Sequence, residues 1–168
     1  MFDNIFNEKT MQELQQQLRE NKKTITCAES CTGGLIASMI TELSGSSDIF
    51  NGSIVSYSNE IKNKKLNVKK ENLEKFGAVS IQVVEDMLEG SINMFDADYS
   101  LATSGIAGPT GATKNKPVGT VVIGVKAKSG DKIVDVYHFD GNRKEVQIQA
   151  AKTSFKIFLE FFQKTLDK

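Results

Sequence analysis

Apolar residues recur at two different spacings along this chain, and the spacing predicts which segments are helices and which are strands. Met11, Leu14 and Leu18 recur at helical spacing among glutamines and glutamates, so an amphipathic helix is expected over about residues 8–21. The same argument predicts helices after the glycines at 33 and 34, from about Ser80, and at the C-terminal end. β-Branched or apolar runs predict strands at residues 24–30, 52–58 and 97–104, and two further strands in GTVVIGVKA and KIVDVYHFD.

Strands that alternate with helices are typical of a layered α/β fold. The last two apolar runs are separated only by KSGD, which predicts a hairpin and therefore a mixed sheet. Residues 59–77 are charged and predict short helical pieces with a solvated lysine-rich face, whereas residues 105–119 are rich in glycine and predict a long loop. We expect a three-layer α/β/α sandwich around a mixed sheet, in one domain over residues 1–168.

Composition and charge exclude several classes of protein. The chain has 168 residues with 21 Lys and Arg against 21 Asp and Glu, so its formal net charge is zero and a nucleic-acid partner is not expected. No basic and apolar leader and no long apolar segment are present, which predicts a cytoplasmic protein without a membrane partner. Cys27 and Cys31 have the spacing C-x3-C and the chain has one histidine, so neither a metal site nor a cofactor is expected.

Polar, glycine-marked segments follow several of the predicted strands, where ligands of α/β sheets usually bind. In AESCTGG (28–34), a strand runs into a helix, so backbone amides and a positive helix end could meet an anion. The loop SGIAGPTGATKNKPVG (104–119) resembles a phosphate loop but does not match the pattern of nucleoside triphosphatases. A plain strand–helix turn remains the alternative for the first segment.

The segment from residue 45 to residue 62 contains a possible nucleophile and base. A serine hydroxyl needs a partner to take its proton, and the one histidine, His138, lies in an apolar run that predicts a sheet face. Lys62 could be that base if burial lowers its pKa, and Tyr57 could position or relay the proton. The alternative is that Lys62 is a surface lysine and Ser47 caps a helix.

Seven motifs in order identify a family. AESCTGG, GSS (45–47), YSNEIK (57–62), GAVS (77–80), SGIAGP (104–109), KPVGTV (116–121) and FDGNR (139–143) resemble the C-terminal domain of the CinA competence/damage-inducible proteins. The similarity covers about residues 22–160. This domain also occurs alone as the PncC-type nicotinamide mononucleotide deamidase, and the length of the chain suggests the stand-alone form.

The resemblance implies hydrolysis of nicotinamide mononucleotide to nicotinic acid mononucleotide and ammonia, without metal or cofactor. It matches Ser47 to the nucleophile, Lys62 and Tyr57 to the residues that activate it, and Ser30 to a second serine of the site. Which of the two serines is the nucleophile stays open. The substrate-binding residues that it implies are Thr32, Gly33, Gly34, Thr103, Ser104, Gly105, Lys116 and Arg143, with Arg143 suited to the substrate phosphate.

Two departures from the family pattern affect the loop and the phosphate site. Ala112 stands where the family often has glycine, and Gln147 stands where it often has a basic residue. The alternative function is a non-catalytic nucleotide-binding or regulatory module of a competence or DNA-damage response. Apolar faces on the first and last helices, together with the family resemblance, predict a homodimer or larger assembly.

Overall fold

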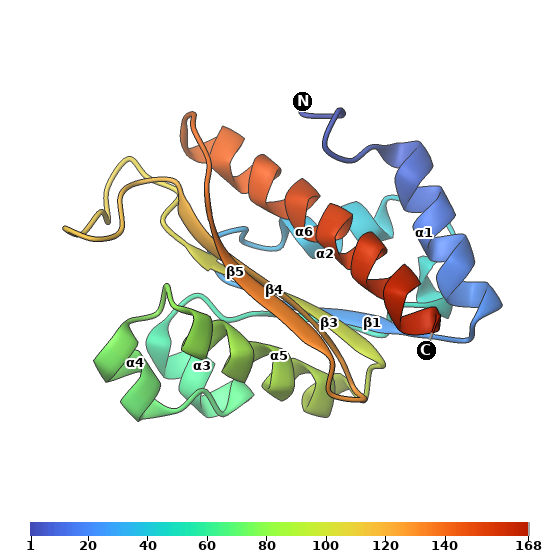
Figure 1. The fold of residues 1–168 in the computed structure, drawn as a ribbon, viewed down its shortest axis with the longest axis horizontal. Coiled ribbons are helices and arrows are strands. Elements are labelled where there is room, and N and C mark those ends of the chain that lie inside the picture. The colour runs from blue at the N-terminus through green and yellow to red at the C-terminus, as the bar shows by residue number, and fades with distance from the viewer. Residues whose placement is uncertain (168) are drawn as a thin grey trace.

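The computed structural model describes residues 1–167 and has helices on both faces of a five-stranded sheet (Figure 1). The helices are α1 (Glu8–Glu20), α2 (Leu35–Thr41), α3 (Asn59–Leu66), α4 (Lys70–Phe76), α5 (Ile81–Phe95) and α6 (Arg143–Leu166), with a short 3-10 helix η1 (Ser46–Asp48). The strands are β1 (Ile25–Glu29), β2 (Ile54–Val55), β3 (Tyr99–Gly105), β4 (Thr120–Ala127) and β5 (Lys132–His138).

The sheet has the order β2-β1-β3-β4-β5 and is mixed. Strand β1 pairs in parallel with both β2 and β3, whereas β4 and β5 run antiparallel to their neighbours. The carboxyl ends of β1, β2 and β3 therefore meet at one edge of the sheet, where the polar segments after these strands come together. This arrangement confirms the expected mixed sheet and its late hairpin.

Two helical layers bury opposite faces of the sheet (Figure 1). Helices α1, α2 and α6 cover one face, with a core that includes Leu14, Cys27 and Phe158. Helices α3, α4 and α5 cover the other face, with Ala28 and Met87 in its core. Neighbouring residues of a strand point to opposite faces, so Cys27 and Ala28 belong to different cores. The three-layer α/β/α architecture predicted from the sequence is confirmed.

Helix α5 begins at the polar residue that precedes its apolar stripe. The side chain of Ser80 accepts a hydrogen bond from the amide of Val83 and begins α5, as expected. Strand β2 is shorter than predicted, because only Ile54 and Val55 of the run 52–58 are strand residues. The amide of the next residue, Ser56, still donates to the Glu29 carbonyl at 2.8 Å, so the chain after β2 lies beside the end of β1.

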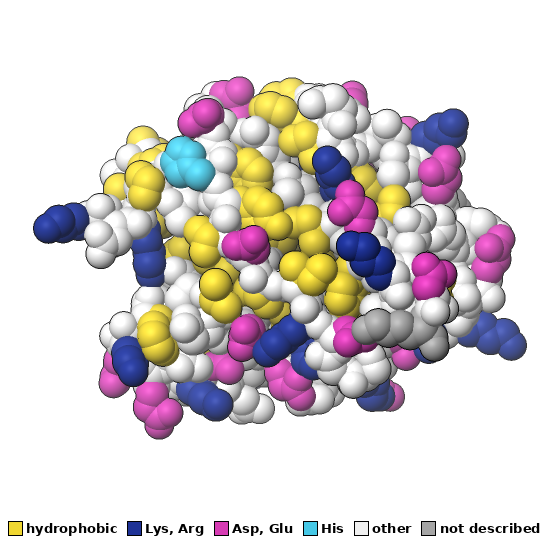
Figure 2. All heavy atoms as spheres, in the orientation of Figure 1, with side chains coloured by type: hydrophobic (Ala, Val, Ile, Leu, Met, Phe, Trp, Pro, Cys, Tyr) yellow, Lys and Arg dark blue, Asp and Glu magenta, His cyan; other side chains and the backbone are white. Residues whose placement is uncertain are grey.

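The surface of the β5 side has an apolar centre. Figure 2 shows apolar side chains gathered on the face that carries β5, with charged side chains around them. Ile133 and Val136 of β5 are among the exposed large apolar residues. Within residues 1–167, no helix is both long enough and apolar enough to span a membrane.

Candidate functional site

Ser30 follows the last residue of β1 and is held there by backbone hydrogen bonds. Its amide donates to the carbonyl of Thr103 on the neighbouring strand at 3.1 Å, and its carbonyl accepts from the amide of Gly33 at 3.0 Å. Gly33 and Gly34 have positive φ angles of 60° and 103°, which glycine adopts without the penalty of a side chain. The two glycines therefore allow the tight turn between β1 and α2 that presents Ser30.

Lys62 approaches Ser30 from the first turn of α3. The hydroxyl of Ser58 caps this helix by accepting from the amide of Ile61. One turn further on, the Lys62 Nζ atom lies 3.0 Å from Ser30 Oγ, 2.8 Å from the Ser56 carbonyl and 3.3 Å from the Tyr57 carbonyl. Lys62 is 1% exposed, so a lysine and a serine form a pair that is largely shielded from water.

The surroundings of Lys62 suit an amine that gives up its proton near neutral pH. Burial lowers the pKa of the Lys62 amine to about 8, because a charged ammonium loses most of its hydration there. Burial also raises the pKa of the adjacent Cys31 thiol to about 12, so Cys31 stays a thiol. Cys31 is itself a small buried side chain, 5% exposed.

Ser47 lies at the opposite end of β1 from Ser30, so the structure does not bring it to Lys62, with which it was expected to pair. It belongs to η1 and is exposed. The next residue, Asp48, forms an ion pair with Arg19, and the Ile49 carbonyl accepts from the amide of Ile25, the first residue of β1. Five strand steps of about 3.3 Å separate that end of β1 from Ser30, roughly 16 Å in all. The geometry brings Ser30, and not Ser47, to Lys62.

Tyr57 contributes its carbonyl to Lys62, but its phenol faces Arg143. The Tyr57 hydroxyl lies 2.9 Å from Arg143 Nη2, and Arg143 Nη1 donates to the Gly108 carbonyl at 2.7 Å. Arg143 is the first residue of α6 and is exposed, and the Tyr57 side chain is 59% exposed. Arg143 and the Tyr57 hydroxyl are therefore hydrogen-bonded to each other at the surface, and the Tyr57 backbone connects them to Lys62. The expected role of the Tyr57 phenol as a proton relay has no contact with Lys62 to support it.

Three hydroxyls expected to bind substrate are engaged inside the protein. Thr32 and Thr103 are buried, and their Oγ1 atoms lie 2.9 Å apart. Ser104 is buried as well and donates to the carbonyl of Ala78 at 2.8 Å. A Cβ atom at Gly105 would lie 2.8 Å from the carbonyl of Thr120, so this glycine permits close strand packing. The three hydroxyls therefore already have hydrogen-bond partners within the protein.

The turn after β1 does not offer the free helix end that its sequence suggested. The buried carboxylate of Glu29 accepts from the amides of Ile36 and Ala37 in the first turn of α2, at 2.8 and 3.1 Å. The positive end of α2 is therefore occupied by a side chain of the protein itself. Glu29 is not among the site residues expected from the sequence, although an acidic residue directly before the turn is the signal that could have identified it.

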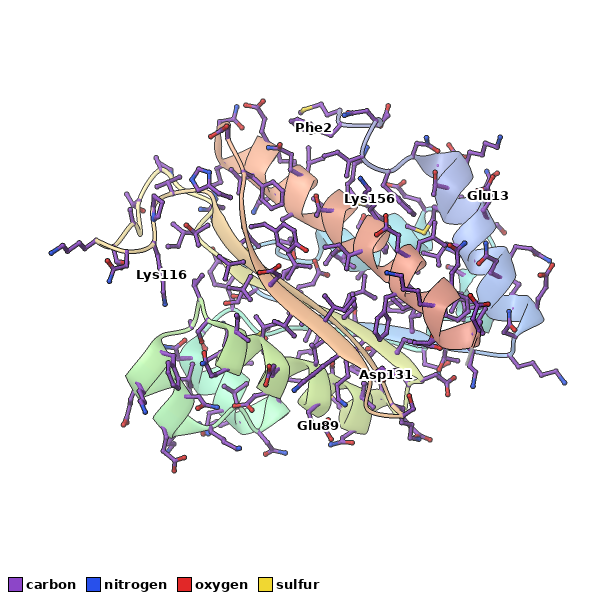
Figure 3. All side chains as sticks on the ribbon, viewed as in Figure 1. Phe2, Glu13, Glu89, Lys116, Asp131 and Lys156 are labelled. Atoms are coloured by element: carbon purple, nitrogen blue, oxygen red, sulfur yellow. The ribbon has the colours of Figure 1, made fainter. Side chains whose placement is uncertain are left out.

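Two more residues connect the site to the helices around it. The Lys116 side chain extends from the long loop toward α4, where its Nζ donates to the Phe76 carbonyl at 2.7 Å (Figure 3). Gln147 donates to the carbonyl of Cys31 at 3.0 Å and so links α6 to the turn that carries Ser30. Ala112, which stands where the family often has glycine, is not among the residues with positive φ, so its side chain causes no backbone strain of that kind. His138 is exposed on β5, 3.0 Å from the carbonyl of Val118.

Comparison with known proteins agrees with the motifs. Residues 7–162 match the model of the CinA C-terminal domain. The chain belongs to this CinA family. A relative named nicotinamide-nucleotide amidohydrolase PncC, from Enterobacter agglomerans, is 43% identical over 94% of this chain and 99% of its own length. A CinA-like protein from Syntrophomonas wolfei is 51% identical over 83% of this chain, but only 33% of its own length. The CinA-domain chain thus spans about a third of the length of the first curated relatives it matches.

Solved structures of the CinA family have the same fold. A CinA superfamily protein from Escherichia coli superimposes with a TM-score of 0.88 at 31% identity, covering 95% of this chain and 92% of its own. A competence/damage-inducible protein from Agrobacterium tumefaciens gives a TM-score of 0.83 at 34% identity, covering 89% and 94%. The arrangement of β1, α2 and α3 that forms the serine–lysine pair is therefore part of a fold with known relatives.

Proposed function

We propose that this protein hydrolyses the carboxamide of a nicotinamide mononucleotide, releasing ammonia and nicotinic acid mononucleotide. The observation that carries the proposal is the buried Lys62 amine, 3.0 Å from the Ser30 hydroxyl. The activity in the name of the Enterobacter agglomerans relative supports the same reaction. Ser30 is the nucleophile in this proposal, and Lys62 is the general base.

The contacts of Lys62 favour proton transfer from Ser30. A neutral amine has two N–H groups and one lone pair, and two backbone carbonyls, those of Ser56 and Tyr57, accept from Nζ. With both N–H groups directed at these carbonyls, the lone pair faces the Ser30 hydroxyl. The backbone around β2 therefore orients the amine so that its lone pair accepts a hydrogen bond from the Ser30 hydroxyl.

The reaction proceeds through an acyl-enzyme. Ser30 Oγ bonds to the carboxamide carbon while its proton moves to Lys62 Nζ, and the lysine ammonium then protonates the departing amine, so that ammonia leaves. Water attacks the ester with Lys62 again as base, which releases the carboxylate and restores the Ser30 hydroxyl. The amides that follow Ser30 in its turn, those of Cys31 and Thr32, are the nearest candidates to bind the oxyanion.

Arg143 supplies a guanidinium for the substrate phosphate. Planar guanidinium groups bind phosphate through two parallel hydrogen bonds, and Arg143 is exposed beside the Tyr57 hydroxyl. The phosphate lies far along the substrate from the amide that is cleaved, so binding it mainly orients the amide for attack. Since Glu29 occupies the amino end of α2, Arg143 is the stronger candidate for this role.

Ammonia release from nicotinamide mononucleotide tests the proposal, with Ser30→Ala and Ser47→Ala as matched variants. We expect Ser30→Ala to lose activity by about a thousandfold or more and Ser47→Ala to stay within about twofold of the wild type. A chelator is expected to change neither result. Full activity in Ser30→Ala with loss in Ser47→Ala would restore Ser47 as the nucleophile. A wild-type protein that binds the nucleotide without releasing ammonia would favour the regulatory binding module.

A further inference from the structure

Glu29 is a buried acid directly beside the proposed nucleophile, and the reaction as described does not use it. It is fully buried at the end of β1. Because neighbouring strand residues point to opposite faces, Glu29 faces α2, whereas Ser30 faces Lys62 on α3. Within residues 1–167, Glu29 has no ion pair with a lysine, arginine or histidine. A buried carboxylate in this position needs an explanation.

Hydrogen-bond donors surround the Glu29 carboxylate on both oxygens. Oε1 accepts from the amide of Ile36 at 2.8 Å and from the hydroxyl of Thr32 at 2.7 Å. Oε2 accepts from the amide of Ala37 at 3.1 Å. Accepting at both oxygens is the arrangement of an ionised carboxylate, and charge-assisted bonds of this kind are stronger than neutral ones. Glu29 thus joins the end of β1 to the start of α2 across the turn that contains Ser30.

The hydroxyl of Thr32 extends this connection to β3, and the direction of its hydrogen bonds can be assigned. The Thr32 hydroxyl has one proton, which it donates to Glu29. In its 2.9 Å contact with Thr103, Thr32 therefore accepts and the Thr103 hydroxyl donates. The backbone carbonyl of Thr103 in turn accepts from the amide of Ser30. The chain Thr103–Thr32–Glu29 therefore closes a ring of hydrogen bonds around the backbone of Ser30.

We propose that Glu29 is a positioning residue, which holds the Ser30 turn through Thr32 and Thr103 so that the Ser30 hydroxyl faces Lys62. The proposal rests on the proposed function, because it takes Ser30 as the nucleophile. The Glu29 carboxylate faces α2, on the opposite side of β1 from the Ser30–Lys62 contact, and acts on the rate by fixing the backbone on both sides of Ser30. Small errors in the placement of a nucleophile reduce the rate of attack strongly, while substrate binding depends on other groups.

Thr32→Val and Thr32→Ser test the proposal, because valine removes the hydroxyl and serine keeps it. The matched control is Thr26→Val: Thr26 is also buried, lies on β1, and donates to the Gly52 carbonyl away from Ser30. The measurements are kcat and KM for nicotinamide mononucleotide, the melting temperature, and the rate at which a fluorophosphonate modifies Ser30, followed by mass. In that modification, the Ser30 oxygen bonds to phosphorus, fluoride leaves, and the proton passes to Lys62.

We expect Thr32→Val to lower kcat and the rate of Ser30 modification by about tenfold each, with KM changed less than about twofold. Thr32→Ser should recover most of both rates. Thr26→Val should lower the melting temperature as much as Thr32→Val while keeping kcat within about twofold of wild type. Glu29→Gln should lower kcat by about a hundredfold or more, because the amide N–H group of glutamine would face a hydrogen-bond donor where the carboxylate oxygen accepts one. If Glu29→Gln does not fold, the comparison of Thr32→Val with Thr32→Ser still tests the positioning role.

Two results would overturn the positioning role: wild-type rates in Thr32→Val, or an equal loss of kcat in Thr26→Val. The modification of Ser30 separates this inference from the proposed substrate. If wild-type Ser30 is modified but nicotinamide mononucleotide is not hydrolysed, the proposed substrate is wrong and the variants are compared by modification rate alone. If wild-type Ser30 is neither modified nor active, both the proposed function and the role of Glu29 are wrong.

Discussion

The activity is expected to rise with pH between pH 7 and pH 9, because only neutral Lys62 can accept the proton of Ser30. Burial of the amine lowers the pKa of Lys62 to about 8. With that value, the neutral fraction is about a tenth at pH 7, about a half at pH 8 and about nine-tenths at pH 9. The specificity constant should therefore rise about fivefold from pH 7 to pH 8, and about tenfold from pH 7 to pH 9.

Other groups of the reaction leave this pH range undisturbed. A phosphate monoester loses its second proton with a pKa of about 6, so the substrate phosphate is mainly dianionic from pH 7 to pH 9. The Cys31 thiol has a pKa of about 12 and stays protonated. A change of slope near pH 8 is therefore assigned to Lys62, the buried amine at the nucleophile.

The assay is the initial rate of ammonia release at substrate concentrations well below KM, because kcat/KM reports the titration of the free enzyme. Measurements at half-unit steps from pH 6.5 to pH 9, at constant ionic strength, define the curve. Circular dichroism at each pH checks that the protein remains folded. A specificity constant that is constant or falling over this range would refute Lys62 as a general base of lowered pKa.

Four further outcomes are expected. Lys62→Arg should fold but lose about a hundredfold or more of the turnover, since guanidinium does not release its proton; near-normal kcat would contradict the base role. Arg143→Ala should raise KM about tenfold or more with kcat changed little, whereas a change confined to kcat would contradict phosphate binding. The free energy of unfolding of the wild type, compared with Lys62→Met, should rise by about 3 kcal/mol between pH 8 and pH 10.5. The sign follows because the pKa is lower in the folded protein, so the unfolded chain binds more protons there; a fall would contradict it. Light scattering should show a dimer or larger assembly, and a particle of 18.5 kDa would contradict that prediction.

The order of the elements could be predicted from local patterns, because each depends on neighbours in the chain. The spacing of Met11, Leu14 and Leu18 reflects one buried face of α1, and all three are buried. The run KSGD between two β-branched segments predicted the β4–β5 hairpin in the same way. The short β2 was less predictable, since where a strand stops pairing depends on its partner strand.

The sequence by itself determined which residue types are present for chemistry: two serine-containing motifs, one lysine after a tyrosine, and one arginine after the last strand. Only the tertiary structure decided which serine meets Lys62. Parallel pairing of β1 with β2 sets the chain after β2 beside Ser30 and leaves Ser47 at the other end of the same strand. The same packing buries the amine and lowers its pKa, and it turns Glu29 toward α2. Burial and strand pairing come from contacts between residues far apart in the chain, so local spacing carries no record of them.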